Sequence, residues 1–356
     1  MTMGTNPTEA AASAKGRAIA ASRRRRELAG GIKQRLASTS IAEPLERYGL
    51  LLLTSIIVAF FALWPQTRDV YLNSANVRVT IGNQTVLGVA AIAAIPPLLC
   101  GRFDLSIGAV LGLAAIGVAA AMSRAGLPLV VAVGLGPAIG AMVGLANGVL
   151  TTRFRIHSLI CTIGTATIIG GVVSWYTGGE SIVSGISPGL IGFGTGEFLL
   201  LPQTVIVLAA VAVAAWFLFQ HTPFGRYLHA IGSNEEASRL VGLRVEHMVV
   251  LSFVLAGAIA GVAGVLLVAR SGGATPTAGP LYALPAFASA FLGAAAIRPG
   301  RFNVWGTMVA ILFLASLTSG LNLAGAQDYV TDLVNGVALL VGVGLTAQFA
   351  RRRAGR

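Results

Sequence analysis

Lysine is nearly absent from this sequence, since Lys15 and Lys33 are the only two among its 356 residues. Neither lysine follows a glycine, so the chain lacks the G-x-x-x-x-G-K-[ST] loop that holds nucleotide phosphates. We therefore expect that this chain does not hydrolyse ATP through such a loop.

Cysteine is also scarce, and the two cysteines, Cys100 and Cys161, each lie in or beside a long apolar run. They indicate neither a disulfide framework nor a metal site. The sequence has no H-E-x-x-H pair, and its one G-x-S-x-G match, residues 185–189, is interpreted as a turn, because no histidine partner is expected near it. We predict a protein that is not an enzyme and has no cofactor.

Long apolar runs dominate what is present. The chain is 55% hydrophobic and has a mean hydropathy of +0.80. About 20 apolar residues suffice to span a bilayer. We therefore predict an all-α polytopic membrane protein with about ten transmembrane helices, at residues 48–64, 79–99, 105–122, 129–150, 158–177, 199–219, 248–269, 281–297, 304–324 and 329–347.

The distribution of basic residues predicts the orientation of these spans. The formal net charge is +12, but Lys and Arg gather on the cytoplasmic side of inserted helices. If the N-terminus is cytoplasmic, every Lys and Arg falls inside except Arg68, Arg78, Arg124 and Arg270. We thus predict cytoplasmic N- and C-termini, with the basicity explained by topology, so that no nucleic acid partner is needed.

This topology divides the chain into three parts: a basic cytoplasmic tail at residues 1–47, a transmembrane domain at 48–347 and a basic C-terminal tail at 348–356. We expect no cleaved signal peptide, because the first apolar run begins late and leads into Pro65. The N-terminal tail is expected either to be disordered or to lie on anionic membrane lipid.

The predicted cytoplasmic loop at residues 220–247 is unusually rich in charge. Within it, Asn234 is a good N-cap, and Glu235 and Glu236 then fall in the first turn of a helix, where carboxylates are favoured. Arg239 follows Glu235 by four residues, and Gly242 provides a left-handed stop. We expect a helix of about two turns with a small apolar patch, which must dock on something to be stable.

This loop carries a family resemblance. Its residues 236–242 fit the pattern E-A-[AS]-x-x-x-G, which resembles the coupling loop of the membrane subunits of bacterial ABC importers. The segment CGRFDLSIGAVLGL at residues 100–113 is similar to a segment of the ribose-type permeases, and so is FGRYLHAIGSNEEASRLVGL at 224–243. With three further segments, the resemblance covers about residues 48–347.

The resemblance implies a transport subunit of the bacterial cytoplasmic (inner) membrane that imports a pentose or hexose. Its implied partners are a separate ABC ATPase subunit, an extracytoplasmic sugar-binding protein and a second permease subunit, identical or different. The coupling helix that contacts the ATPase would comprise Asn234, Glu235, Glu236, Ala237, Arg239, Leu240, Val241 and Gly242.

Polar residues in or beside the spans are candidates for a translocation pathway, namely Asn83, Asp104, Ser106, Asn147, Thr165 and Asn322. For Asp104 there are two hypotheses: it lines a polar cavity, or, as we favour, it caps the following helix. The similar tetrapeptides GRFD and GRFN, at 101–104 and 300–303, lie in two predicted cytoplasmic loops. Their similarity is explained either by a helix-capping role or by a distant duplication. Most of the other polar residues are expected to form hydrogen bonds between packed helices. Four glycines at a spacing of four residues, from Gly136 to Gly148, are expected to mark close helix packing.

Two alternative functions stay open. A permease of the same class could carry another small solute, such as a branched-chain amino acid, a nucleoside or a furanosyl signal. An ion-coupled secondary carrier is a different class, and it would need an ionisable residue within a span. No candidate span has an acidic residue near its middle, which disfavours the carrier.

Overall fold

The computed structural model describes residues 42–354 of the chain. The helices in chain order are α2 (Ala42–Leu63), α3 (Arg68–Tyr71), α4 (Ser74–Leu99), α5 (Ile107–Ser123), α6 (Leu129–Arg153), α7 (Ser158–Thr177), α8 (Pro188–Thr195), α9 (Thr204–His221), α10 (Pro223–Ser233), α11 (Glu235–Leu240), α12 (Val245–Ser271), α13 (Ala283–Gly293), α14 (Val304–Leu323) and α15 (Asp328–Ala354). A 3₁₀ turn, η1 (Gly279–Tyr282), precedes α13, and strands β1 (Glu197–Phe198) and β2 (Leu201–Pro202) pair antiparallel. The contacts described below lie within the compact unit that begins at Leu50.

The predicted all-α polytopic class is confirmed. Seven helices, α4, α6, α7, α9, α12, α14 and most of α15, are long and apolar enough to cross a membrane. Three shorter apolar helical segments, Arg47–Leu63, Ile107–Ser123 and Gly279–Gly293, lie where the other three spans are predicted. The count of about ten transmembrane helices remains a prediction.

Two predicted spans are shortened by four or more residues in the structure. The span expected to begin at residue 199 begins only at Thr204, because Leu199 and Leu200 form the turn of the β1–β2 hairpin with φ of 50° and 67°. The span expected to reach residue 297 ends at Gly293, where the Asn303 side chain donates to the carbonyl oxygens of Gly293 and Ala296 at 3.3 and 3.1 Å.

Of the two predicted tails, the N-terminal one falls outside the described residues up to residue 41. The structure is helical from Ala42 onward. At the other end, residues 348–354 of the predicted C-terminal tail continue α15 to Ala354.

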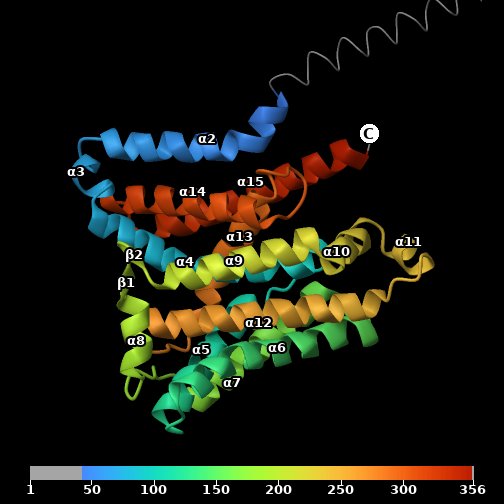
Figure 1. The fold of residues 1–356 in the computed structure, drawn as a ribbon, viewed down its shortest axis with the longest axis horizontal. Helices are drawn as coiled ribbons and strands as arrows, with labels where there is room; N and C mark the ends of the chain where they lie inside the picture. The colour runs from blue at the N-terminus through green and yellow to red at the C-terminus, as the bar shows by residue number, and fades with distance from the viewer. Residues whose placement is uncertain (1–41, 355–356) are drawn as a thin grey trace, which may run out of the picture. The chain divides into compact units, whose positions relative to one another are not determined.

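Helix α12 lies at the centre of the core and packs on α4, α5 and α6 (Figure 1). Its contact with α6 is a glycine seam, formed by Gly136, Gly140 and Gly144 of α6 with Gly257 and Gly261 of α12. A Cβ atom on Gly140 would overlap the carbonyl oxygen of Gly257, and one on Gly257 would overlap that of Gly140. The predicted close packing of the glycine stripe is therefore confirmed, since only glycine lets the backbones meet.

The connecting elements gather at the two ends of the long helices. Helices α10 and α11 lie at one end, and α3, α8 and the β1–β2 hairpin lie at the other (Figure 1). Helix α4 joins these ends, and it contains two consecutive buried prolines, Pro96 and Pro97, in its last turn. The first end carries the charged segment singled out from the sequence.

Candidate functional site

Helix α11 forms as its local sequence predicts. The Asn234 side-chain oxygen accepts a hydrogen bond from the backbone N–H of Ala237 at 2.9 Å, which satisfies one donor of the first turn. Gly242 has a φ of +85°, in the left-handed region, and the N–H of Leu243 returns to the Ser238 carbonyl at 3.0 Å. The predicted N-cap and stop are confirmed, and the helix between them has six residues.

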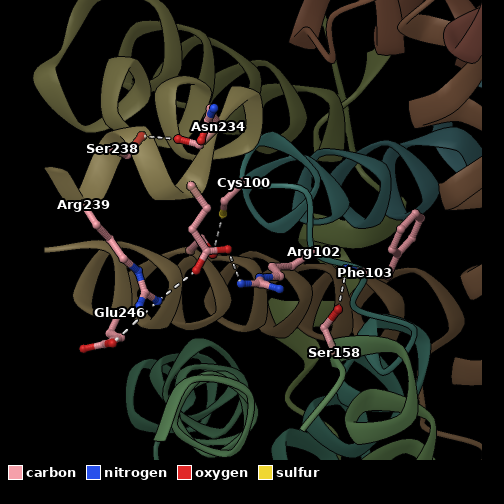
Figure 2. Close-up of polar contacts among 10 residues, drawn as sticks. Cys100, Arg102, Phe103, Ser158, Asn234, Ser238, Arg239 and Glu246 are labelled. Atoms are coloured by element: carbon pink, nitrogen blue, oxygen red, sulfur yellow. Dashed lines mark hydrogen bonds and ion pairs between the residues drawn. The ribbon is translucent and has the colours of Figure 1, made fainter. Parts of the chain in front are cut away.

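Ion pairs hold α11 against the rest of the chain. The Glu235 carboxylate accepts from Arg239 at 2.9 Å, as predicted, and from Arg102 of the α4–α5 loop at 2.7 Å (Figure 2). Arg239 also lies 3.7 Å from Glu246 at the start of α12. Because these side chains are partly exposed, each pair stabilises the fold by about 0–1 kcal/mol. Their main effect is to fix the position of α11 relative to α4 and α12.

The α4–α5 loop that carries Arg102 is itself held by the start of α7. The backbone N–H of Phe103 donates to the Ser158 hydroxyl at 3.1 Å (Figure 2). The backbone N–H of Leu105 donates to the Thr162 hydroxyl at 3.0 Å. These bonds satisfy backbone donors that lie outside any helix. Arg102 therefore projects from a fixed loop.

The outer surface of α11, which we call the α11 face, consists of Glu236, Ala237, Leu240 and Val241. All four residues are exposed, and the side chains of Leu240 and Val241 have exposed fractions of 89% and 78%. Two adjacent apolar side chains this exposed at the tip of a charged loop leave the α11 face available for another molecule.

Helix α10 supports α11, and the sequence did not indicate it. Proline is favourable at the first position of a helix, and Pro223 starts α10 there. Leu228 and Ile231 are buried. A Cβ on Gly232 would overlap the carbonyl oxygen of Leu99, so the end of α10 rests directly on the end of α4.

His229 of α10 is partly buried near the loop between α13 and α14. Burial lowers the pKa of this imidazole, and the positive charges of Arg301 and Arg298 lower it further. The side chain is therefore neutral over a wider pH range than an exposed histidine.

Four of the six candidate pathway residues meet in one buried network. The Asp104 carboxylate accepts from the backbone N–H of Ser106 at 3.1 Å and from its hydroxyl. The Asn147 amide donates to the Ser106 hydroxyl at 2.9 Å and accepts from Thr165 at 2.7 Å. Asp104, Ser106 and Asn147 are buried, so these contacts join α5, α6 and α7 rather than line an open passage.

The favoured interpretation of Asp104 as a helix cap is wrong. The N-cap position of α5 is Ser106, and Asp104 bonds to that residue instead of to a helical N–H. Burial raises the pKa of the Asp104 carboxyl to about 6, although the bonds from Ser106 oppose this shift. In the second tetrapeptide, by contrast, Asn303 does cap α14, because its side-chain oxygen accepts from Gly306 N–H at 2.7 Å.

The other two candidates lie elsewhere. Asn322 is exposed on α14. Asn83 of α4 accepts a hydrogen bond from Arg270 of α12 at 2.9 Å and lines a cavity of about 500 Å³, which we call the α4–α15 cavity, together with residues of α13, α14 and α15. The sequence did not indicate Arg270 or Arg102 as partners, because each contacts a residue more than 100 positions away.

Comparison with known proteins agrees with this architecture. A family model described as "Branched-chain amino acid transport system / permease component" matches residues 80–343. The ribose import permease of Escherichia coli (strain K12) is 32% identical over 302 residues, which cover 84% of this chain and 92% of that relative. The ribose import permease of Bacillus subtilis is 35% identical over 274 residues, covering 77% and 85%. The D-allose transport system permease of Escherichia coli (strain K12) is 29% identical over 301 residues, covering 84% and 91%.

No solved structure matches the chain. The family match nevertheless spans well over half of the sequence, and the predicted resemblance to ribose-type ABC permeases is confirmed. With its long apolar helices, the chain is a multi-pass protein of the bacterial inner membrane. It belongs to the permease family of the branched-chain amino acid transport systems, in which the ribose-type permeases are its relatives.

Proposed function

We propose that this chain is the membrane-spanning subunit of an ATP-driven importer that moves a sugar of the ribose type. The observation that carries the proposal is the α11 face, a small apolar surface on a short capped helix at one end of the unit. An ATPase subunit would bind this face and supply the hydrolysis that the present sequence has no phosphate loop to perform.

The proposed orientation places α10 and α11 in the cytoplasm, with both termini on that side and ten spans in all. Supporting it, the arginines of this end lie on several elements brought together in space. Arg102 pairs with Glu235, Arg298 and Arg301 lie near His229, and Arg153 shares a pocket with Glu246. A cluster of arginine at one end of apolar helices is the pattern found on the cytoplasmic side.

Helix α11 is linked closely to the long helices, so a displacement of α11 would be transmitted to them. Only residues 241–244 separate it from α12, the central helix of the core. The pair between Arg239 and Glu246 bridges the same junction, and the pair between Glu235 and Arg102 reaches the end of α4. Closure of an ATPase dimer on α11 would therefore displace α12 and α4 together.

The remaining proposed partners would cover other surfaces. Leu333, Val337 and Leu340 form an exposed apolar row on α15, which suits either lipid or a second permease subunit, identical or different. A sugar-binding protein would deliver substrate at the end that carries α8 and the β1–β2 hairpin.

Capture of the ATPase tests the proposal. The chain would be tagged, expressed with its native partners and purified in mild detergent, alone and as the variant Leu240→Glu/Val241→Glu. We expect a partner with a phosphate-binding loop to co-purify with the native chain and to be lost with the variant. Because both side chains are exposed, this change leaves the fold intact.

A matched control makes the same change at the other end. Leu199 and Leu200 have exposed fractions of 81% and 78%, nearly those of the α11 pair, and Leu199→Glu/Leu200→Glu should keep the ATPase. Equal capture by both variants would contradict the proposed contact. If instead no ATPase accompanies the native chain, and uptake collapses with an uncoupler, the ion-coupled carrier becomes the better hypothesis.

The family description names branched-chain amino acids, whereas the relatives' names specify ribose and D-allose. The second candidate function is therefore a permease for such an amino acid. Uptake of D-ribose, D-allose and L-leucine by the purified complex in proteoliposomes separates the two.

A further inference from the structure

The α4–α15 cavity has a lining suited to neutral hydrogen-bonding ligands. Its polar side chains are Asn83 and Gln84 of α4, Tyr282 of η1, Thr318 of α14, and Thr331 and Asn335 of α15. The other lining residues are leucine, alanine and proline, and none carries a charge. Its volume of about 500 Å³ lies within the usual range of small-molecule sites, about 300–1,000 Å³.

One acceptor in this lining has no partner. The Gln84 side-chain oxygen is buried and receives no hydrogen bond from the residues that the structure describes. Leaving a buried acceptor unsatisfied costs about 1–3 kcal/mol, so a rotation of the Gln84 amide toward the cavity is favoured when a ligand there brings a donor. The network of Asp104, Ser106, Asn147 and Thr165, by contrast, satisfies its groups internally. Polar residues whose hydrogen bonds are satisfied within the protein join helices, whereas an unsatisfied group beside the cavity favours ligand binding.

Arg270 fixes the orientation of the neighbouring amide. Its guanidinium donates to the Asn83 side-chain oxygen at 2.9 Å and approaches the Gly194 carbonyl at 3.4 Å. A Cβ on Gly82 would lie 2.5 Å from this guanidinium, so glycine at this position lets Arg270 lie against α4 as it does. Because arginine only donates, the Asn83 oxygen must face it, and the Asn83 NH₂ group remains available as a donor.

We propose that the α4–α15 cavity is a resting site for the translocated substrate, that it takes a neutral polyhydroxylated molecule such as a free monosaccharide, and that Arg270 is its positioning residue. This inference rests on the proposed function and deepens it. Each hydroxyl of a sugar both donates and accepts, so it can bond to Gln84 oxygen and to the Asn83 amide. A zwitterionic amino acid would bring an ammonium group to a lining that has no acidic side chain.

The position of the cavity agrees with this role. Asn83 and Gln84 lie in the first half of α4, and Arg270 is in the last turn of α12, both toward the end with α8 and the hairpin (Figure 1). In the proposed orientation this is the end at which a binding protein releases its sugar. The substrate would therefore meet the cavity before it passes the buried network.

The test uses the complete importer in proteoliposomes, with its ATPase and binding protein, and radiolabelled D-ribose, D-allose and L-leucine as probes. Gln84→Leu and Asn335→Leu each remove a neutral hydrogen-bonding group with little change in volume. We expect each to lower sugar moved per ATP hydrolysed by about 2- to 10-fold, the effect of one lost neutral hydrogen bond. Gln66→Leu, which changes an exposed amide in the loop between α2 and α3 and outside the cavity lining, is the matched control and should transport normally.

The positioning role of Arg270 is tested by a measurement that would not change if the residue only stabilised the fold. Arg270→Gln should lower sugar per ATP, and Arg270→Lys, which retains a donor for Asn83, should restore part of it. In an Asn83→Ala background, Arg270→Gln should have little further effect, because the two residues act as one unit. Additive losses in the double variant would refute the positioning role.

The outcomes separate this inference from the proposed function. If the native complex moves sugar and the Gln84 and Asn335 variants do so at the native ratio, the cavity is not on the pathway, while the function stands. If the native complex hydrolyses ATP but moves only L-leucine, both the sugar assignment and the inference fail. Each variant is first checked for ATPase capture, and loss of function by only one of the two cavity variants would also contradict a shared site.

Discussion

Replacing Gly140 with alanine tests whether the glycine seam is essential to the α6–α12 contact. A Cβ at this position would overlap the carbonyl oxygen of Gly257, which belongs to the backbone and cannot rotate away. Gly134 of the same helix is the matched control, because a Cβ there meets no atom within 4 Å. The two substitutions are chemically identical and differ only in what the added methyl group contacts.

Two opposing effects set the magnitude. Changing glycine to alanine within a helix stabilises it by about 1 kcal/mol, and this gain applies to both variants. Overpacking at Gly140 destabilises by about 1–3 kcal/mol, and here the neighbour is backbone, so the upper part of that range is expected. The difference between Gly140→Ala and Gly134→Ala isolates the overlap, and it corresponds to a change of about 5- to 150-fold in the ratio of folded to unfolded protein.

The assay is unfolding in detergent micelles, followed by the fluorescence of the four tryptophans as the fraction of denaturing detergent rises. We expect Gly134→Ala to unfold at or above the midpoint of the native chain and Gly140→Ala clearly below it. If Gly140→Ala unfolds together with Gly134→Ala, the backbones do not meet at the seam and the packing argument is refuted.

Three further predictions concern individual side chains. Asn234→Ala removes the α11 cap, should destabilise that helix by about 1 kcal/mol and weaken ATPase capture, whereas Asn234→Asp should retain capture. The pKa of His229 is lowered in the folded state, so between that pKa and about 6.5 the unfolded state binds more protons than the folded state. The stability of the fold should therefore fall as the pH drops from 7.5 to 5.5, and His229→Gln should reduce the accompanying fall in melting temperature. Asn147→Ala removes two hydrogen bonds of the buried network, to Ser106 and from Thr165, and should lower the free energy of unfolding by about 1–3 kcal/mol. Thr167→Ala, at an exposed site, should change it by less than about 0.5 kcal/mol.

Helix α11 could be predicted because each of its signals is local. The cap at Asn234, the pair between Glu235 and Arg239 and the left-handed Gly242 involve residues at most four positions apart. The glycine stripe was readable for a similar reason, since a spacing of four places its members on one face of α6.

What the sequence could not supply is the identity of partners distant in the chain. Asp104 followed by an apolar run looks like a cap, and only the fold brings Asn147 and Thr165 to the same network. The hairpin at Leu199 and Leu200 was missed because a leucine-rich turn has the same hydropathy as the start of a span. The pairing of Arg270 with Asn83 depends on how α4 crosses α12, which no periodicity encodes.

The paired prolines of α4 have a mechanical consequence. Each proline lacks the N–H that would bond to the preceding turn, so two successive rungs of the helical ladder are missing at Pro96 and Pro97. Bending stiffness is therefore lowest between the part of α4 that lines the cavity and the loop that holds Arg102. Under the proposed function, a displacement of α11 would therefore bend α4 at this joint, and the rest of the helix would keep its packing.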